Sequence, residues 1–197
     1  MRLRQTSVEG RAAELAIDVV AHSSLTVDDV AGLRRLFDAE YQQGFGDWDP
    51  DLPYGYAPHD FHIVARQGGK IVGHVGWARR AIRVGDREMV IAGVGGVMVS
   101  YRARGERLGG RLMNRAEESM TDAGGIAFGY LGCREEVVSF YTACGWTRIF
   151  ARSVRSAVPD NQFSTRPGNR CSSCPLSTGL LPGPAVRSTC AVARGDC

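Results

Sequence analysis

The chain has 197 residues, of which 44% are hydrophobic and 23% are charged. This length fits one compact domain with a tail better than two full domains. The net charge of +3 is small, and the basic residues form no lysine-rich block, so nothing indicates nucleic-acid binding. No run of about 18 apolar residues is present, and residues 1–14 lack the apolar stretch of a secretory signal. We therefore expect no membrane-spanning helix and a cytoplasmic location.

The first half of the chain predicts a strand, a helix and then a series of antiparallel strands. Residues 14–20 (ELAIDVV) mix alternating and continuous apolar positions and predict the first strand. Thr26 is a candidate N-cap for a helix over 27–41. Residues 42–60 combine glycines and prolines with aromatic residues and predict a long functional loop. Strands are expected at 61–66, 70–80, 81–84 and 87–99, with a hairpin turn at residues 67–69.

The second half alternates strand-like and helix-like segments. A turn at 101–110 precedes a helix over 111–123, a strand at 126–132, a short helix over 135–143 and a strand at 146–154. This order implies that the strands around residues 97 and 128 are parallel neighbours. Residues 161–197 show little apolar periodicity and offer no closing strand of convincing length. We therefore divide the chain into a domain over 1–160 and an irregular tail over 161–197.

The turn between residues 97 and 112 carries the first chemical signal. A strand that enters a glycine-bearing turn and then a helix presents unpaired backbone N–H groups, which suit a pyrophosphate. Gly105, Gly109 and Gly110 permit close backbone approach, and nearby arginines add positive charge. Taken alone, these glycines fit a basic helix start on a solvated surface equally well.

A second motif, Tyr141-Thr-Ala-Cys-Gly-Trp146, follows the short helix. Together the two motifs resemble the GNAT N-acetyltransferase superfamily, whose members carry R-x-x-G-x-G/A after the fourth strand and Y-x-x-x-G-[FW] later. The second motif matches completely, whereas Arg107 stands at the first glycine position of the first. The resemblance covers about residues 14–155. It implies an α/β fold of the α+β kind, with a mixed, mostly antiparallel sheet, a parallel pair at the acetyl-CoA site and flanking helices.

The resemblance also implies roles for individual residues. Tyr141 would be the general acid that protonates the departing thiolate, since a phenol pKa near 10 is close to that of the thiol; the alternative is a tyrosine that packs the core. Acetyl-CoA would be the cosubstrate. Its pantetheine arm would bind the backbone of Val97, Met98 and Val99, and its pyrophosphate would bind the segment Arg104, Gly105, Glu106, Arg107, Leu108, Gly109 and Gly110.

Two branches of the superfamily are similar in more detail. The paired Arg79-Arg80 and the form Arg104-Gly-Glu-Arg107-Leu are similar to the aminoglycoside 2'-N-acetyltransferases, and the segments from His74 and Val154 are similar to the nodulation N-acyltransferases. The former group commonly has V-E-G on the fourth strand, where this chain has Val94-Gly95-Gly96. Gly95 cannot act as a base, so we expect a water relay or a carboxylate, Asp47 or Asp49, to replace the acid.

The segment between Arg35 and Arg66 indicates the acceptor. It contains no basic residue but six acidic ones. In a GNAT domain this segment borders the acceptor pocket, so an acidic, aromatic wall favours a polyamine-like or aminoglycoside-like cation. The alternative is a solvated acidic loop whose aromatic residues pack into the core. The residues predicted to contact the acceptor are Asp47, Trp48, Asp49, Asp51 and Gly95.

Three functions are compatible with these patterns. The first is 2'-N-acetylation of an aminoglycoside or a related small cationic amine, an antibiotic-resistance activity, by direct attack in a ternary complex. The second is transfer of a longer acyl chain to a glycan amine, and the third is a non-catalytic acyl-CoA-binding module. We expect no metal, because His74 has no second ligand at suitable spacing and Cys171-x-x-Cys174 lacks a supporting fold. The resemblance is compatible with a homodimer.

Overall fold

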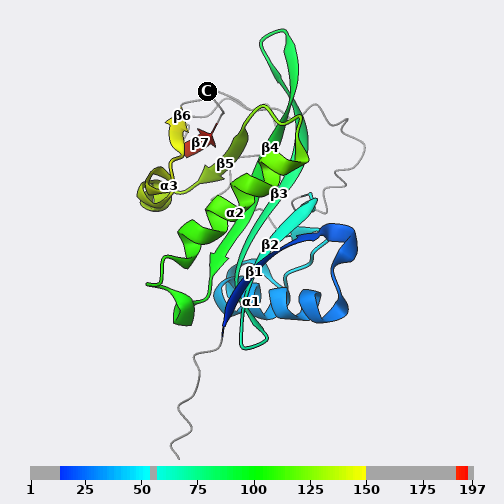
Figure 1. Cartoon of the computed structure of the whole chain (residues 1–197), viewed down its shortest axis with the longest axis vertical. Helices are drawn as coiled ribbons and strands as arrows, with labels where there is room; N and C mark the ends of the chain where they lie inside the picture. Colours follow the sequence, from blue (N-terminus) through cyan, green and yellow to red (C-terminus); the bar gives the residue numbers. More distant parts are fainter. Residues whose placement is uncertain (1–13, 54–56, 150–189, 195–197) are drawn as a thin grey trace, which may run out of the picture.

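The computed structural model describes residues 14–53, 57–149 and 190–194 (Figure 1). Within these residues a mixed sheet has the strand order β1-β2-β3-β4-β5-β7-β6. The strands are β1 (Leu15–Ala21), β2 (Phe61–Gln67), β3 (Lys70–Val84), β4 (Arg87–Val99), β5 (Gly129–Cys133), β6 (Thr147–Ile149) and β7 (Cys190–Arg194). The helices are α1 (Val27–Phe45), α2 (Leu108–Ala123) and α3 (Val138–Ala143), with 3-10 turns η1 (His22–Ser24), η3 (Tyr101–Ala103) and η4 (Glu135–Val137).

Most neighbouring strands in the sheet are antiparallel. Strands β1 to β4 form a meander, and β7 pairs antiparallel with both β5 and β6. The parallel pair is β4 with β5, which confirms the expected parallel neighbours. The prediction of a mixed, mostly antiparallel sheet with flanking helices is therefore confirmed.

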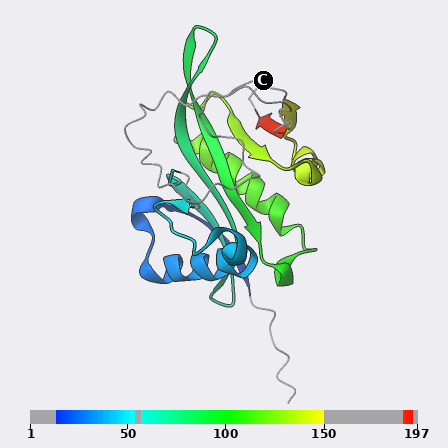
Figure 2. The same cartoon turned by 180° about the vertical axis from the view of Figure 1, so that it is seen from behind.

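The two long helices cover opposite faces of the sheet (Figures 1 and 2). Successive strand residues point to opposite faces, so Ile63 packs with α2 residues such as Leu112, whereas Val64 packs with α1 residues such as Phe37. Trp48, which follows α1, lies in the second of these clusters. The sheet thus separates an α2 side from an α1 side.

Helix α1 begins as predicted and ends later. Thr26 and Asp29 form a capping box at its N-terminus. The helix continues past residue 41 to Phe45 and ends where Gly46 adopts a φ of 78°. Helix α2 begins at Leu108 rather than 111, because Gly109 and Gly110 belong to its first turn and not to the preceding loop.

The far side of the sheet differs most from the sequence-based expectation. Residues 190–194 form β7, although no strand was expected after residue 161. Strand β5 begins at Gly129, three residues later than predicted. The remainder of the strand predicted over 146–154 and the domain boundary near residue 160 lie outside the described residues. Among the described helices, none combines the length and apolar character needed to cross a membrane.

Candidate active site

The edge of β4 opens away from β5 after only two residue pairs. Ala92 pairs with Gly129 and Gly93 with Tyr130, whereas residues 131–133 of β5 pair only with β7, on the opposite edge of β5. The segment 94–99 of β4 therefore has no strand partner on this side within the described part of the chain. Unpaired strand backbone can hydrogen-bond an extended, amide-containing molecule as if that molecule were another strand. The residues predicted to bind pantetheine, Val97–Val99, lie on this open edge.

The N-terminus of α2 follows this edge after the 3-10 turn η3. It has no side-chain cap and no acidic residue in its first turn. The N–H groups of Leu108, Gly109 and Gly110 precede the first intrahelical hydrogen bond, which Arg111 donates to the Arg107 carbonyl at 3.1 Å. Unpaired N–H groups and the helix dipole make this terminus a suitable site for a phosphate anion.

Arg107 has a backbone conformation that explains its place in the motif. Its φ of 56° and ψ of 19° are left-handed, and it is the one non-glycine residue with positive φ in the described parts of the chain. Glycine adopts this conformation without a steric penalty. The turn therefore keeps the geometry of the usual glycine motif, while Arg107 places an exposed guanidinium beside the helix terminus.

Arg104 lies earlier in the same turn. Its Nε donates to the Val99 carbonyl at 3.2 Å, and its guanidinium lies 5.6 Å from the centre of the Tyr101 ring. The side chain of Glu40 on α1 is 3.5 Å away. These contacts tie the turn to the end of β4 and to α1, so the strand edge and the anion site are held together.

Helix α3 packs closely against the start of α2. A Cβ on Gly109 would lie 3.0 Å from the Phe140 ring, whereas a Cβ on Gly110 would have its nearest neighbour, the Cys144 sulfur, at 4.0 Å. Gly109 therefore permits the close approach of α3. Tyr141, the next residue after Phe140, is thereby fixed relative to the anion site.

Tyr141 is almost completely buried, with 7% of its surface exposed. Burial raises the pKa of its phenol well above the usual range, and the nearby Cys133, Tyr41 and Cys144 raise it further. A phenol with a raised pKa keeps its proton at neutral pH. Tyr141 therefore holds the proton that the predicted general acid needs, while the same rise in pKa makes the phenol a weaker acid than an exposed tyrosine.

A bulge interrupts β4 next to the open edge. His74 pairs with Met98, and Gly76 pairs with Gly95. The two pairs are two residues apart on β3 but three residues apart on β4. The extra residue lies at Gly96 and Val97, and Gly96 has a φ of 58°. The bulge redirects the strand where Gly95 stands in place of the acid of V-E-G.

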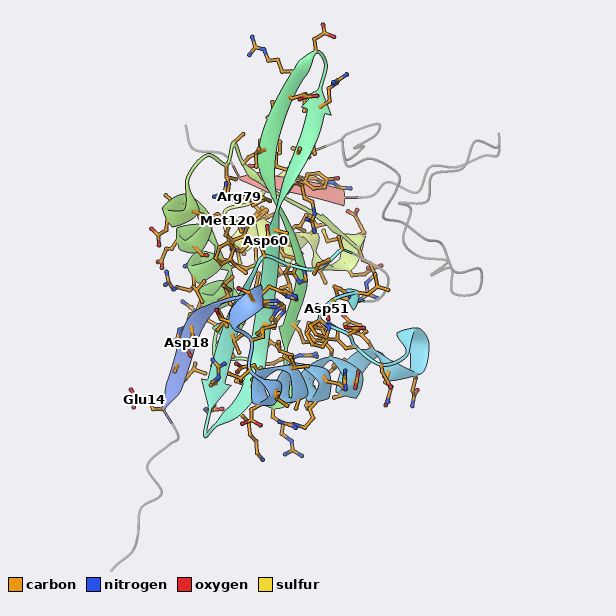
Figure 3. All side chains as sticks on the ribbon, turned by 90° about the vertical axis from the view of Figure 1, so that its right-hand side faces the viewer. Glu14, Asp18, Asp51, Asp60, Arg79 and Met120 are labelled. Carbon is orange, nitrogen blue, oxygen red and sulfur yellow. The ribbon has the colours of Figure 1, made fainter. Side chains whose placement is uncertain are left out.

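Behind the bulge, on the α1 side of the sheet, three histidines form a continuous chain. His22 Nε2 lies 3.0 Å from an Asp51 carboxylate oxygen, and its Nδ1 lies 3.1 Å from His62 Nε2. His62 Nδ1 is 2.9 Å from His74 Nε2, and His74 Nδ1 is 2.7 Å from the Gly96 carbonyl oxygen. The chain thus connects the loop that contains Asp51 (Figure 3) to the bulge.

The hydrogen bonds of this chain need one proton more than three neutral imidazoles provide. A carboxylate and a carbonyl can only accept, so the contacts from Asp51 through to Gly96 require four protons, whereas three neutral rings carry three. Burial, and then neighbouring charges, lower the pKa values of His62 and His74 to about 3, so these two rings are neutral. When all three rings are neutral, one of the four contacts therefore has no proton between its two atoms.

The predicted acceptor residues are partly separated. Asp47 and Asp49 are exposed; Asp47 accepts from Gln42 Nε2 at 2.9 Å, and Asp49 accepts from the Asp51 N–H at 2.9 Å. Trp48, in contrast, is 1% exposed and stacks on Phe37 with ring centres 5.0 Å apart. Trp48 is therefore a core residue, which agrees with the alternative interpretation that the aromatic residues of this loop pack into the core. It presents no face to an acceptor.

The pair Arg79-Arg80 has structural contacts. Arg79 donates through both terminal nitrogens to the carbonyls of Ala123 and Gly124 at the end of α2. Arg80 Nη2 donates to the Pro58 carbonyl at 2.9 Å. The first arginine thus caps a helix, and the second holds the loop before β2.

Sequence reasoning considered His74 as a metal ligand without a second ligand, and it gave no role to His22, His59 and His62. A signal was present, because the chain has only four histidines and the predicted hairpin puts His62 and His74 on adjacent strands. No group of three or more His, Cys, Asp or Glu side chains within the described ranges is arranged to hold a metal.

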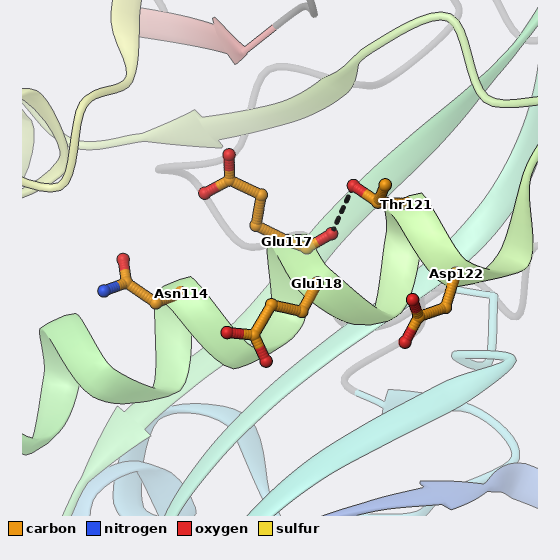
Figure 4. A pocket seen from close by; sticks show the side chains of 5 residues that line it. All are labelled: Asn114, Glu117, Glu118, Thr121 and Asp122. Carbon is orange, nitrogen blue, oxygen red and sulfur yellow. Dashed lines mark hydrogen bonds between the residues drawn. The ribbon is translucent and has the colours of Figure 1, made fainter.

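A shallow hollow lies elsewhere, on the outer surface of α2 (Figure 4). All its lining residues come from this one helix, and three of them are acidic: Asn114, Glu117, Glu118, Thr121 and Asp122. Such a row of acidic side chains is typical of a solvated helix surface. The hollow therefore adds nothing to the candidate site.

Comparison with known structures defines the class of the fold. The structure is similar to Escherichia coli ElaA, with a TM-score of 0.56 and 22% identity over 70% of this chain and 90% of that one. An acyl-CoA N-acyltransferase from Pseudomonas aeruginosa gives a TM-score of 0.55 and 20% identity over 70% and 92% of the two chains. An aminoglycoside acetyltransferase from an uncultured soil metagenomic sample was solved in complex with trehalose. Its TM-score is 0.52, and the identity is 18% over 66% of this chain and 86% of that one. At these identities the likeness establishes the fold alone.

The family follows from the sequence profile. The profile described as an acetyltransferase (GNAT) domain matches residues 23–149. This chain therefore belongs to the GNAT acetyltransferase family. A search of curated protein sequences finds no match.

Proposed function

We propose that this protein transfers an acetyl group from acetyl-CoA to a primary amine of a small cationic acceptor, most specifically the 2'-amino group of an aminoglycoside. The observation that carries the donor half of the proposal is the juxtaposition of an open β4 edge, an uncapped α2 N-terminus and a buried Tyr141. These three features match an amide-containing arm, a pyrophosphate and a thiolate that must be protonated.

The reaction proceeds by direct attack in a ternary complex. The amine lone pair attacks the thioester carbonyl carbon, and the carbon–sulfur bond then breaks. Tyr141 donates its proton to the sulfur as the carbon–sulfur bond breaks, and its raised pKa keeps that proton on the phenol until then. The protein contributes chiefly by holding the two substrates in one geometry.

The acceptor half rests on charge. Asp47, Asp49 and Asp51 expose their carboxylates on the loop after α1, whose described part contains no Lys or Arg, and Asp51 alone of the three lies beside a histidine, His22. Carboxylates concentrated at one rim attract a polycationic substrate. The similar fold of an aminoglycoside acetyltransferase supports the same acceptor class. Trp48 is not part of the proposal because it is buried.

A free-thiol assay tests this function. The purified protein is mixed with acetyl-CoA and a panel of aminoglycosides and polyamines, and amine-dependent release of CoA is expected for at least one aminoglycoside. A second series replaces acetyl-CoA with longer acyl-CoA donors, for which slower release is expected. Binding of CoA without turnover of any amine in the panel contradicts the assignment.

A further inference from the structure

Attack by the amine requires a group that removes a proton from it, and position 95 supplies none. The carboxylates of Asp47 and Asp49 are exposed, and their hydrogen bonds stay within or next to their own loop. A base can also reach Gly95 from the last residues of this loop, next to β2. His59, which precedes β2, does so.

The His59 ring lies over glycines of β3 and β4. A Cβ on Gly95 would lie 3.2 Å from His59 Nε2, and a Cβ on Gly96 would lie 3.3 Å from His59 Cε1. On Gly76, a Cβ would overlap the ring itself. The imidazole thus occupies the space that side chains at these positions would fill, with Nε2 next to the position of the missing acid.

The backbone on both sides of His59 is fixed. Arg80 donates to the Pro58 carbonyl at 2.9 Å, and the Arg79 N–H donates to the Asp60 carboxylate at 2.7 Å (Figure 3 labels Arg79 and Asp60). The Asp60 N–H also donates to the Trp77 carbonyl at 2.9 Å. A side chain held between two anchored residues keeps its direction, as catalysis requires.

His59 differs from the other three histidines in its hydrogen bonding. They share a continuous chain, whereas the buried Nδ1 of His59 has no hydrogen-bond partner among the described residues. His59 contacts the chain only through its ring, with ring centres 5.6 Å from His62 and 5.9 Å from His74. A buried polar atom without a partner is unfavourable for folding, and such atoms in native proteins often serve a function.

We propose that His59 is the proton acceptor of the transfer reaction, and this assignment rests on the proposed function. As the carbon–nitrogen bond forms, one N–H proton passes from the amine to His59 Nε2. Tyr141 gives one proton to the departing sulfur. Solvent then carries a proton away from His59 and returns one to Tyr141, so one amine and one thioester yield one amide and one thiol.

The surroundings of His59 keep it neutral before the reaction. Burial, followed by the charges of His62, Arg80 and His22, lowers its pKa to about 3. Within the described residues, these groups and the ring of His74 are the titratable and charged neighbours that face it. The same surroundings disfavour the cation that forms when His59 accepts a proton.

The test compares His59→Gln with the control Arg83→Gln in the thiol-release assay. Glutamine retains a polar group near the position of Nε2 but accepts no proton, so we expect kcat of His59→Gln to fall about 100-fold or more. Arg83 is exposed near the tip of the β3–β4 hairpin and pairs with Glu88, so its substitution should change kcat less than threefold. The dissociation constant of CoA should stay within threefold of the wild-type value in both variants.

Rescue separates a catalytic role from a structural one. Adding imidazole to His59→Ala, or adding Gly95→Glu to His59→Ala, should raise kcat at least tenfold, because either change restores a base beside position 95. If His59→Gln does not fold, these two rescue experiments on His59→Ala decide whether His59 acts as the proton acceptor. A His59→Gln variant with wild-type kcat, or no response in either rescue, overturns the assignment while leaving the proposed function intact. Absence of amine-dependent turnover by the wild type overturns both.

Discussion

His74 Nδ1 lies 2.7 Å from the carbonyl oxygen of Gly96, and this contact ties the bulge of β4 to the histidine chain. His74 is completely buried, so neither of its ring nitrogens can exchange its partner for water. The left-handed Gly96 is thus held from one side by β3 and its histidine. The open edge of β4 owes its shape to a buried polar contact as well as to apolar packing.

Replacing His74 by phenylalanine should destabilise the fold. The substitution leaves His62 Nδ1 and the Gly96 carbonyl without their present partner in a buried setting, at a cost of about 2–4 kcal/mol for the two groups. Urea unfolding at pH 7.5 measures the loss. The matched change His22→Gln, at the half-buried end of the chain, should cost less than about 1.5 kcal/mol. A His74→Phe variant within 1 kcal/mol of the wild type would show that the chain is dispensable.

The histidine cluster should make the fold sensitive to acid. The pKa values of His59, His62 and His74 are lowered to about 3 by burial, from an unfolded value near 6.5. Between these limits the unfolded chain binds more protons, so stability is full above pH 6.5 and falls as the pH decreases toward 3. Each histidine contributes a slope of at most about 1.4 kcal/mol per pH unit.

Urea unfolding at pH 7.5, 6.0, 5.0 and 4.5 measures this dependence. Burial alone would raise the pKa of Asp29, but its hydrogen bonds with Thr26 and its contact with Arg66 lower the pKa overall. Asp29 therefore loses its contribution to the unfolding free energy only below pH 4.5. The loss above pH 4.5 therefore reports on the histidines. Equal unfolding free energies at pH 7.5 and 4.5 would contradict the buried, neutral state of these rings.

The donor half of the site could be predicted from the sequence because its signals are local. A strand, a glycine-bearing turn and a helix follow one another without interruption, so their order specifies both the β4 edge and the α2 terminus. Tyr141 follows within the next unit. The left-handed conformation of Arg107 is also implied by its place in a glycine motif.

The acceptor half could not be predicted in the same way because its contacts are long-range. His22, His59, His62 and Asp51 come from separate segments, and only strand register and loop packing bring them together. Trp48, on the loop after α1, enters the core, and the composition of the loop does not reveal which of its aromatic rings will do so. Strand β7 is five residues long in a segment rich in glycine and proline, so its pairing with β5 and β6 decides its structure.

Tyr141→Phe should abolish most of the activity without weakening CoA binding. The phenol is buried and its pKa is raised, so it carries its proton at any pH where the fold is stable. Loss of a general acid lowers kcat by about 100-fold or more. Calorimetry with CoA checks that the dissociation constant is unchanged. Tyr130→Phe, on β5, is the matched control and should retain wild-type kcat; equal activity in the two variants would favour a non-catalytic acyl-CoA-binding module.

Arg107→Gly should stabilise the protein, since it removes the left-handed strain of a residue with a side chain. The strain amounts to about 1–2 kcal/mol, and the greater freedom of glycine in the unfolded chain offsets about 0.5–1 kcal/mol of the gain. A rise of about 0.5–1 kcal/mol in the unfolding free energy is expected. Arg107→Val should lower it, because a branched side chain fits this conformation worse. If both variants are less stable than the wild type, the guanidinium rather than the backbone stabilises the turn.

Gly109→Ala and Gly110→Ala provide a matched pair within the first turn of α2. Both gain helix propensity, worth about 0.5–1 kcal/mol. The new methyl group meets the Phe140 ring at 3.0 Å in the first variant but has 4.0 Å to its nearest neighbour in the second. Thermal and urea unfolding should therefore find Gly110→Ala more stable than the wild type and Gly109→Ala less stable than Gly110→Ala by about 1–2 kcal/mol.

The same pair tests whether α3 must lie close to α2 for activity. Accommodating a methyl group at Gly109 pushes Phe140 outward, and Tyr141 follows because it is the next residue on the same helix. Small displacements of a proton donor reduce the rate strongly, so kcat of Gly109→Ala should fall about tenfold or more. Measuring kcat at saturating acetyl-CoA removes any effect on donor binding. If Gly109→Ala keeps wild-type kcat while its stability falls as expected, the close contact between α3 and α2 serves folding alone.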